Sequence, residues 1–246
     1  MTILEKDQEL GAVGPVQEVD ETLLSKVHVA RRIGVREYRP SGWRTRAVDD
    51  MSETDMNAAT EQSDKMMNGS ITQFVWFLLM FQAAGLQAHM WKRDIQNAVR
   101  RLPVLAEHTV FVWIVWIWQS MMLAAPHLGM PFGATASVVA WHRVGAFLAA
   151  VVCRIAKAPV ARYVDDFFGA SRQGLVWPGG KMLTLICSLT GLLCDVGKDV
   201  DASLRIVVLG MMVEHSWQEQ KVLVRLEEDK AAMWREFLMD ACSVCD

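Results

Sequence analysis

Apolar residues recur along this chain at two spacings, one typical of helices and one typical of strands. Helix-length apolar segments are predicted at 16–33, 70–85, 134–156, 180–193 and 226–241. Shorter segments rich in β-branched and aromatic residues are predicted to form strands at 88–95, within 109–126, at a hairpin near 163–170 and within 205–225. The mixture favours an α+β fold, in which an antiparallel sheet is backed by helices, over a helical bundle or a β-sandwich.

The segment from 38 to 69 follows neither spacing. It is polar and rich in Gly, Ser, Asn and Asp, so we expect an irregular, mobile region with one short strand at the TRAV of 45–48. The compact apolar part of the chain is expected to begin near Ile71.

Two apolar stretches could be read as membrane spans. Residues 72–81 are far fewer than the roughly 20 apolar residues that a spanning helix needs. The stretch 110–125 is longer, but Gln119 and Ser120 interrupt its apolar run. Its first half is dense in β-branched and aromatic residues, which favours buried strands. We therefore expect no membrane segment. Three tryptophans of this stretch are expected to pack in the core rather than to stack on bases: Trp113, Trp116 and Trp118.

Length and cysteine content narrow the class of protein. The chain has 246 residues, enough to bury a sizeable core without disulfides, and five cysteines. An odd number of cysteines and an opening sequence without an apolar segment behind a basic start argue against a secreted, disulfide-stapled protein. We expect an intracellular protein, cytoplasmic or nuclear. Cys242 and Cys245 form a CxxC, but zinc needs four ligands and no second pair completes the set.

The formal net charge of −3 conceals a strongly basic segment. Between residues 31 and 46 the chain has six arginines against the single acid Glu37, and further basic residues flank Asp94. Binding of phosphate requires local rather than global positive charge, so this distribution is compatible with a nucleic-acid partner. For any single arginine, a solvated surface position is an equally good interpretation.

The string APVARYVDDFFGA, residues 158–170, places two adjacent carboxylates among apolar residues. Neighbouring side chains of a strand point to opposite faces, so Asp165 and Asp166 can address one site only at a tight turn or strand end. Two desolvated carboxylates need protons or a cation, and Mg²⁺ suits them. The alternative is a solvated turn, and Asp49–Asp50 in RAVDDMS, next to an open polar loop, serves as the internal control for it.

YVDD at 163–166 resembles the signature hairpin of reverse transcriptases. Other strings resemble further motifs of that family in the family's order: RTRAVDDMSETDMNAAT at 44–60, WKRDIQNAVRRLPV at 91–104, HLGMPFGATASVVAWHRV at 127–144, LTGLLCDVGKD at 189–199 and IVVLGMMVE at 206–214. The resemblance covers roughly residues 31–226 and is greatest to retrotransposon-type enzymes. It implies an RNA-directed DNA polymerase, a nucleotidyltransferase with a fingers-palm fold.

The resemblance also implies roles for individual residues. Asp94, Asp165 and Asp166 would hold two Mg²⁺ ions, with Mn²⁺ as a substitute, for in-line attack by a primer 3′-hydroxyl. Lys198 would donate a proton near the pyrophosphate. The residues expected at the nucleotide are Arg44, Arg46, backbone at Ile95, Val99, Phe132 and Gly133. Those expected to grip the primer are Leu209 and Gly210.

The resemblance further implies a division of the chain and a set of partners. The expected parts are an N-terminal helical extension (1–30), a fingers-like segment (31–87), a palm (88–226) and a C-terminal helix that begins a truncated thumb (227–246). The expected partners are an RNA or DNA template with its primer and deoxynucleoside triphosphates. No ribonuclease H or integrase segment is recognised, so further domains of a longer polyprotein would supply them.

One position departs from the family's pattern. Reverse transcriptases usually have an aromatic residue five positions after the first catalytic Asp, where it blocks a ribose 2′-hydroxyl, and this chain has Val99. Ribonucleotides could therefore be admitted. The alternative function is a catalytically inactive, polymerase-like remnant that binds nucleic acid or a partner protein.

Overall fold

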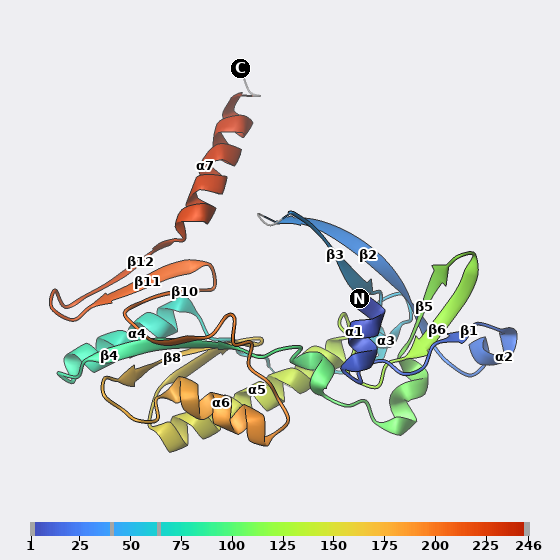
Figure 1. Cartoon of the computed structure of the whole chain (residues 1–246), viewed down its shortest axis with the longest axis horizontal. Helices are drawn as coiled ribbons and strands as arrows, with labels where there is room; N and C mark the ends of the chain where they lie inside the picture. Colours follow the sequence, from blue (N-terminus) through green and yellow to red (C-terminus); the bar gives the residue numbers. More distant parts are fainter. Residues whose placement is uncertain (1–2, 40–41, 63–64, 244–246) are drawn as a thin grey trace. The chain divides into compact units, whose positions relative to one another are not determined.

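A computed structural model describes residues 3–39, 42–62 and 65–243 of the chain (Figure 1). The C-terminal CxxC lies outside this description, because neither Cys245 nor the side chain of Cys242 is included.

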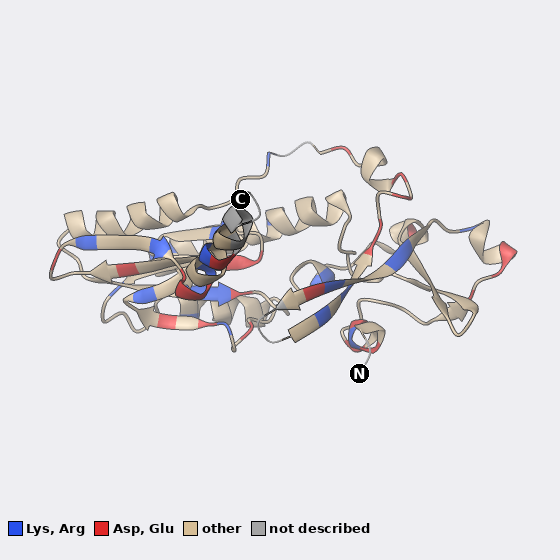
Figure 2. Cartoon of the chain, turned by 90° about the horizontal axis from the view of Figure 1, so that it is seen from above, with Lys and Arg blue, Asp and Glu red and all other residues tan. Residues whose placement is uncertain are grey.

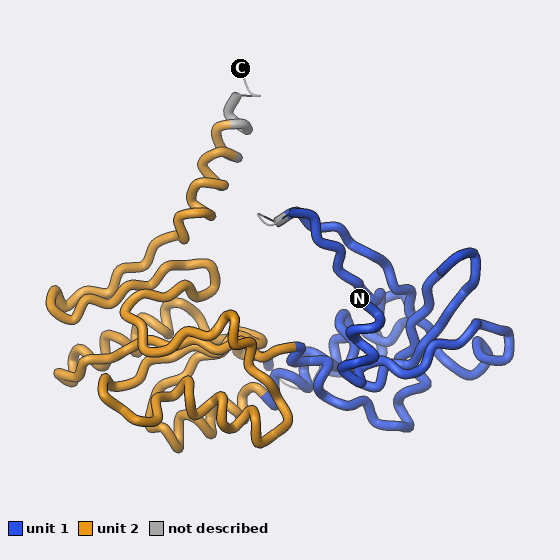
Figure 3. The backbone as a smooth tube through the Cα atoms, viewed as in Figure 1, with its two compact units in different colours: residues 1–66, 97–144 blue, residues 67–96, 145–246 orange. Residues whose placement is uncertain are grey.

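The chain divides into two compact units, each described by itself (Figure 3). Unit 1 consists of Met1–Met66 and Asn97–Val144, and unit 2 consists of Met67–Gln96 and Gly145–Asp246. Each unit therefore combines segments that are distant in sequence, and the segments expected as 31–87 and 88–226 each contribute to both units.

Unit 1 is built on a five-stranded sheet with the strand order β1-β6-β5-β2-β3, in which only β2 and β5 are parallel. The strands are β1 (Gln17–Glu18), β2 (Val29–Arg39), β3 (Gly42–Asp49), β5 (Trp113–Trp118) and β6 (Met121–Pro126). The helices are α1 (Ile3–Glu9), α2 (Glu21–Leu24), α3 (Met56–Ala59) and the 3₁₀ helices η1 (Val99–Arg101) and η2 (Ala106–Phe111). The buried core consists of Val13, Ala30, Met51, Ile114, Ala125 and Ala134.

The β2–β3 hairpin extends beyond this sheet. β2 pairs with β5 only from Val29 to Arg31, whereas it pairs with β3 from Arg32 to Arg39. From Arg32 to Arg39, no third strand among the described residues pairs with the hairpin. Because side chains alternate between the two faces of a strand, both faces of the hairpin can meet solvent.

Unit 2 contains two sheets. The first has the order β7-β8-β4-β9 and consists of β4 (Ala88–Asp94), β7 (Val160–Tyr163), β8 (Asp166–Arg172) and β9 (Val200–Ser203). The second has the order β10-β11-β12 and consists of β10 (Arg205–Val208), β11 (Met211–Ser216) and β12 (Lys221–Leu226). The helices are α4 (Ile71–Ala83), α6 (Gly179–Leu189), α7 (Glu228–Ser243) and the C-terminal part of α5 (Thr135–Ala156), which begins in unit 1.

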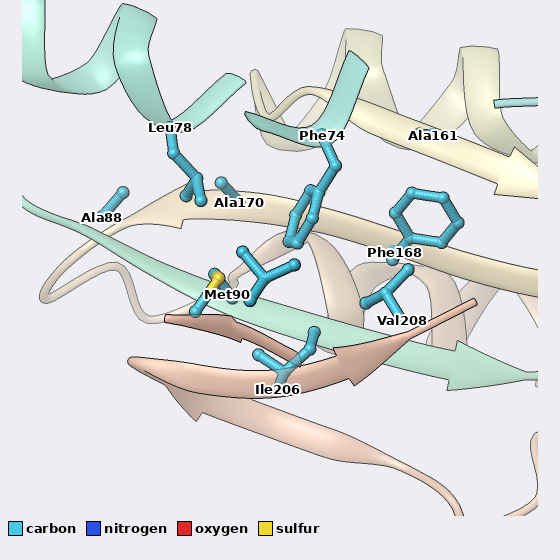
Figure 4. Close-up of a cluster of buried hydrophobic side chains, with 10 residues drawn as sticks. Phe74, Leu78, Ala88, Met90, Ala161, Phe168, Ala170, Ile206 and Val208 are labelled. Atoms are coloured by element: carbon cyan, nitrogen blue, oxygen red, sulfur yellow. The ribbon is translucent and has the colours of Figure 1, made fainter. Parts of the chain in front are cut away.

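The central strands β4 and β8 are buried on both faces. On one face, Met90 and Phe168 pack in a cluster that α4 and β10 complete, and the rings of Phe74 and Phe168 lie 5.4 Å apart, edge to face (Figure 4). On the other face, Trp91 lies so close to α6 that a Cβ at Gly179 would be 2.7 Å from its ring. This packing fixes the two strands whose ends carry the candidate catalytic carboxylates.

Most predicted elements are present. The helices expected near 70–85, 134–156, 180–193 and 226–241 are α4, α5, α6 and α7, and the strands expected after residue 88 are β4 to β8 and β10 to β12. The predicted α+β class, with sheets backed by helices, is confirmed.

Two predictions in the first quarter of the chain are wrong. Residues 16–33 do not form one helix, because Asp20 caps a single turn, accepting a hydrogen bond from the Leu23 N–H at 2.7 Å, and β2 begins at Val29. The short strand expected at 45–48 is part of β3, but β3 is longer than expected and pairs with β2 over its whole length, so residues 38–69 are less irregular than predicted. In both places strand pairing overrides local propensity, since β2 pairs with the distant β5 and with the neighbouring β3.

The apolar stretch at 110–125 lies mainly in β5 and β6, as expected. Trp118 is nevertheless 58% exposed, so the prediction that it packs in the core is wrong. Within the described part of the chain, α5 is the one helix that is long and apolar enough to cross a membrane, by length and composition only. Core helices meet the same criterion, and Leu148 and Val152 of α5 are buried.

Candidate active site

Two of the predicted catalytic residues face each other across neighbouring strands. Asp94 ends β4 and is paired with Asp166, the first residue of β8. The next contact continues the ladder, because the Ile95 N–H donates to the Asp165 carbonyl oxygen at 3.1 Å. Side chains that lie opposite each other in an antiparallel pair point to the same face, so Asp94 and Asp166 share one end of the sheet.

A tight turn carries Asp165. Tyr163 pairs with Asp166, so Val164 and Asp165 form a two-residue connection between β7 and β8. Val164 has a φ of 53°, a left-handed conformation that is strained for a β-branched residue. Its carbonyl oxygen accepts a hydrogen bond from Arg162 Nη1 at 3.0 Å, which holds the turn. Backbone strain of this kind is concentrated at functional sites.

Two lysines neutralise part of the negative charge. Lys92 Nζ lies 3.2 Å from Asp166 Oδ1, and Lys198 Nζ lies 2.7 Å from Asp94 Oδ2. The hydrogen bond to Asp94 raises the pKa of Lys198, so this side chain is an ammonium ion. Lys92 was not among the predicted site residues. Its position two residues before Asp94 on a strand is the signal that could have identified it.

Asp165 is in a less favourable environment. Burial raises the pKa of Asp165, and the carboxylates of Asp94 and Asp166 raise it further, although a backbone hydrogen bond and Lys198 act in the opposite direction. Like charges in a partly buried cluster favour binding of a proton or a cation. The three carboxylates are therefore close enough to interact electrostatically, although Asp94 is far from the other two in sequence.

The loop that carries Lys198 is attached to the end of β4. The Asp195 N–H donates to the Asp94 carbonyl oxygen at 2.8 Å, and the Gln96 N–H donates to the Leu193 carbonyl oxygen at 2.8 Å. A further hydrogen bond joins the Lys198 N–H to the Asp195 carbonyl oxygen at 2.8 Å. These contacts position the exposed Lys198 beside the carboxylate of Asp94.

The predicted site residues fall into three groups. Asp94, Ile95, Asp165, Asp166 and Lys198 meet within unit 2. Leu209 and Gly210 form the turn between β10 and β11 in the same unit, with φ values of 51° and 75°. The remaining residues belong to unit 1: Arg44, Arg46, Val99, Phe132 and Gly133.

Arg44 and Arg46 lie on β3. They are two residues apart, so their side chains point to the same face of the hairpin, and both are exposed. Arg46 Nη1 is 3.5 Å from Glu37 Oε2 on β2. An exposed ion pair of this kind is weak, so a phosphate could replace the carboxylate.

The Phe132–Gly133 turn is held from two sides. Gly133 has a φ of 91°, and a Cβ there would lie 2.6 Å from the Asp49 carbonyl oxygen, so only glycine fits. Asn57 Nδ2 donates to the Gly133 carbonyl oxygen at 2.9 Å, and Asn57 Oδ1 accepts from the first N–H of α5 at 2.8 Å. The ring of Phe132, 45% exposed, lies over the Arg100 guanidinium at 4.9 Å. Val99, next to Arg100, is buried.

Asp49 is not the solvated residue that the sequence suggested. It is 2% exposed and accepts two hydrogen bonds from Arg32, at 2.6 and 2.9 Å, and one from His127 Nε2 at 3.1 Å. Arg32 and Arg100 also reach Asp7, each at 3.0 Å. Burial alone raises the pKa of Asp49, but the His127 and Arg32 hydrogen bonds hold it well below its usual range.

The carboxylates of unit 2 fit a magnesium ion by their chemistry. Among the described residues, no three His, Cys, Asp or Glu side chains form a group that could hold a metal by themselves. Mg²⁺ is usually bound by one or two carboxylates, water and substrate phosphates rather than by an all-protein cage. Paired carboxylates at the end of a sheet, with a third on the adjacent turn, provide such a partial ligand set.

No protein-family model and no curated protein matches this sequence. Solved structures do match. The chain superimposes on the foamy viral protease-reverse transcriptase dRH in complex with double-stranded DNA with a TM-score of 0.67 and 13% identity, over 92% of this chain and 34% of that one. The fold is reverse-transcriptase-like.

A second structure agrees. The prototype foamy virus protease-reverse transcriptase CSH mutant matches with a TM-score of 0.61 and 16% identity, over 87% of this chain and 25% of that one. This chain thus spans about a third or less of the two viral proteins. The reverse-transcriptase-like fold is shared although few residues are identical, so the likeness concerns the fold and leaves the chemistry to the residues of the site.

Proposed function

We propose that this chain is the polymerase domain of a retrotransposon-type reverse transcriptase, which adds deoxynucleotides to a primer on an RNA or DNA template. The observation that carries the proposal is the pairing of Asp94 with Asp166 beside a strained turn at Asp165. Adjacent like charges at the end of a well-packed sheet make no contribution to folding that a neutral pair would not make better. Their arrangement is understandable if the site binds a cation.

The chain's own residues would act by position and charge. Asp94 and Asp165 would hold two Mg²⁺ ions, or Mn²⁺ ions, with Asp166 as the third acid. When bound, the ions would activate the primer 3′-hydroxyl and neutralise the leaving pyrophosphate. Lys198 is protonated and beside Asp94, where it can give a proton to the pyrophosphate oxygen.

Residues of unit 1 would bind the nucleotide. The resemblance assigns 31–87 to fingers, 88–226 to a palm and 227–246 to the beginning of a thumb, and we propose these assignments for this chain. Arg44 and Arg46 share an exposed face that suits the triphosphate, since guanidinium groups bind phosphate oxygens in pairs. Leu209 and Gly210 would contact the primer. The foamy viral protein's complex with double-stranded DNA supports nucleic acid as the partner.

Primer extension tests the proposal. The purified chain is given a primed RNA template, Mg²⁺ or Mn²⁺, and deoxynucleotides or ribonucleotides in separate reactions. We expect metal-dependent incorporation of deoxynucleotides that Asp165→Asn reduces by roughly a thousandfold, about 4 kcal/mol of transition-state stabilisation. Asp50→Asn is the matched control, since it makes the same replacement of one carboxylate oxygen by an amide NH2 group in the other Asp-Asp pair and should retain activity.

The same experiment separates the alternatives. Incorporation of ribonucleotides as well would show that Val99 leaves room for a 2′-hydroxyl. A folded protein that binds the primed template and incorporates neither nucleotide would contradict the proposal and favour the inactive remnant.

A further inference from the structure

The projecting part of the β2–β3 hairpin has two chemically different faces. Cross-strand partners share a face, so Tyr38 lies beside its partner Trp43, and Arg36 beside Thr45. We call this the ring face, defined by these four residues. The opposite face carries Arg44 and Arg46, which alternate with the ring-face residues along β3. The basic residues of the two strands are shown in blue in Figure 2.

The two rings of this face are largely in solvent. Tyr38 is 71% exposed and Trp43 is 72% exposed. Their centroids are 5.4 Å apart with an interplanar angle of 67°, an edge-to-face contact that leaves ring surface open. Large aromatic side chains gain free energy by leaving water, so two of them exposed side by side mark a surface that a partner can cover.

The surroundings of the rings indicate the chemistry of that partner. Arg36 is exposed on the same face, and no ion pair to it is found among the described side chains. The next cross-strand pair of this face towards the sheet is Gly34 and Ala47, two small residues that leave space beside Arg36. Stacking rings beside guanidinium groups are the combination with which proteins bind single-stranded nucleic acid, because every base has a π-face and every nucleotide has a phosphate.

A second hairpin of the same unit has exposed apolar side chains without charged residues among them, and so serves as a comparison for the ring face. The β5–β6 hairpin also ends in exposed apolar side chains, with Ile117 at 72% and Trp118 at 58% exposure. Its sequence from Trp113 to Pro126 contains no charged residue. Cross-strand aromatic contacts can stabilise any hairpin, so Arg36 beside the rings, rather than the rings alone, distinguishes the ring face.

We propose that Tyr38, Trp43 and Arg36 form a platform that stacks one or two unpaired bases of single-stranded RNA or DNA and binds the adjoining phosphate. The identity of the bound strand rests on the proposed function, because in a polymerase this strand would be the unpaired part of the template. Binding itself requires neither metal nor nucleotide. Arg44 and Arg46 lie on the opposite face, so the platform does not use the residues proposed to bind the triphosphate.

Fluorescence anisotropy of a labelled oligonucleotide tests the platform on the full chain, in EDTA and without nucleotide. The probes are a twelve-nucleotide oligopyrimidine, chosen because it lacks secondary structure, and a blunt duplex. We expect Trp43→Leu, which keeps an apolar cross-strand contact but removes the ring, to weaken single-strand binding by about tenfold and duplex binding far less. Arg36→Gln should reduce the dependence of affinity on salt concentration by about one phosphate contact.

Two further variants make the result decisive. Trp43→Tyr retains a ring and should recover most of the affinity, which distinguishes stacking from a general loss of hairpin structure. Trp118→Leu, the matched control on the other hairpin, should bind as the unsubstituted chain does. Equal single-strand affinity of Trp43→Leu and the unsubstituted chain would overturn the platform. Because the assay contains no metal, its outcome is independent of whether the chain polymerises nucleotides.

Discussion

The chain has two Asp-Asp pairs, one in each unit, and their surroundings are opposite. Asp49 is surrounded by cations and donors, with Arg32 and His127 bonded directly to its carboxylate. Burial and then the carboxylates of Asp94 and Asp166 raise the pKa of Asp165, whereas hydrogen bonds from His127 and Arg32 lower the pKa of Asp49 in spite of its burial. A buried carboxylate whose charge is satisfied belongs to the structure of the protein. A partly buried carboxylate whose charge is not fully compensated by its neighbours is a candidate for binding a further cation.

The largest effect on folding is expected at Asp49. Asp49→Asn removes the charge that compensates Arg32 and Arg100 inside unit 1, so we expect unfolding free energy to fall by about 3 to 5 kcal/mol. Equilibrium urea unfolding measures the loss. Asp50→Asn, at a less buried position, should change stability by about 0.5 kcal/mol or less. Equal losses for the two variants would contradict the distinction between them.

The second prediction concerns acid. Because the folded pKa of Asp49 is depressed, its contribution to stability is complete above the unfolded pKa of about 4 and is lost as pH falls towards the folded value. The unfolding free energy from urea titrations at pH 7 and at pH 3 should therefore be lower at the acid end, by about 1 kcal/mol for this group. The Asp49→Asn variant should show a smaller acid dependence. An unchanged dependence would mean that other groups dominate acid unfolding.

Asp165 should behave in the opposite way. Its raised folded pKa means that ionisation costs stability above the unfolded pKa, so Asp165→Asn should stabilise the chain at neutral pH by up to about 1 kcal/mol, while reducing incorporation by roughly a thousandfold. The gain should disappear below about pH 4, where Asp165 is protonated. Thermal unfolding at pH 7 and pH 4 measures both. A destabilised Asp165→Asn variant at pH 7 would indicate a structural role.

The smallest effect is expected at Lys92, whose Nζ forms an ion pair with Asp166 Oδ1 at 3.2 Å. Lys92→Gln removes a cation that competes with Mg²⁺ and leaves a polar, uncharged side chain that is one atom shorter. We expect half-maximal incorporation at a Mg²⁺ concentration about two- to fivefold lower, since partly exposed ion pairs are worth about 1 kcal/mol or less. Arg172→Gln, at the other end of β8, is a charge-matched control that should leave the Mg²⁺ dependence unchanged.

The sequence predicted one of the two Asp-Asp pairs better than the other, for a physical reason. The surroundings of Asp165 and Asp166 are local, since the apolar flanks and the turn lie within a few residues, whereas Asp94 was predicted from the resemblance of 91–104 to a reverse-transcriptase motif. The surroundings of Asp49 are not local, since His127 is 78 residues away and Arg32 is 17 residues away. No pattern of spacing indicated that they would converge, and the helix expected at 16–33 concealed the strand that carries Arg32.

The exposure of the hairpin side chains also depends on contacts that no local sequence pattern indicates. Alternation placed the tryptophans of β5 on a strand, but which faces are covered depends on which strands come to lie beside it, and β5 extends beyond its neighbour β2. Trp118 is therefore exposed, contrary to expectation. The two arginines of β3 were predicted as a pair, and their common face follows from strand geometry once β3 is known to be long.

Electron paramagnetic resonance of Mn²⁺ shows whether the three carboxylates of unit 2 hold a metal ion. Free Mn²⁺ is titrated with the chain in the presence of the next complementary deoxynucleotide and a template whose primer ends in a dideoxynucleotide, so that the complex with nucleotide forms but cannot react. We expect the chain to bind Mn²⁺ under these conditions, Asp165→Asn and Asp94→Asn each to abolish that binding, and Asp50→Asn to leave it intact. If Asp165→Asn binds Mn²⁺ as well as the unsubstituted chain does, these carboxylates are not the metal site.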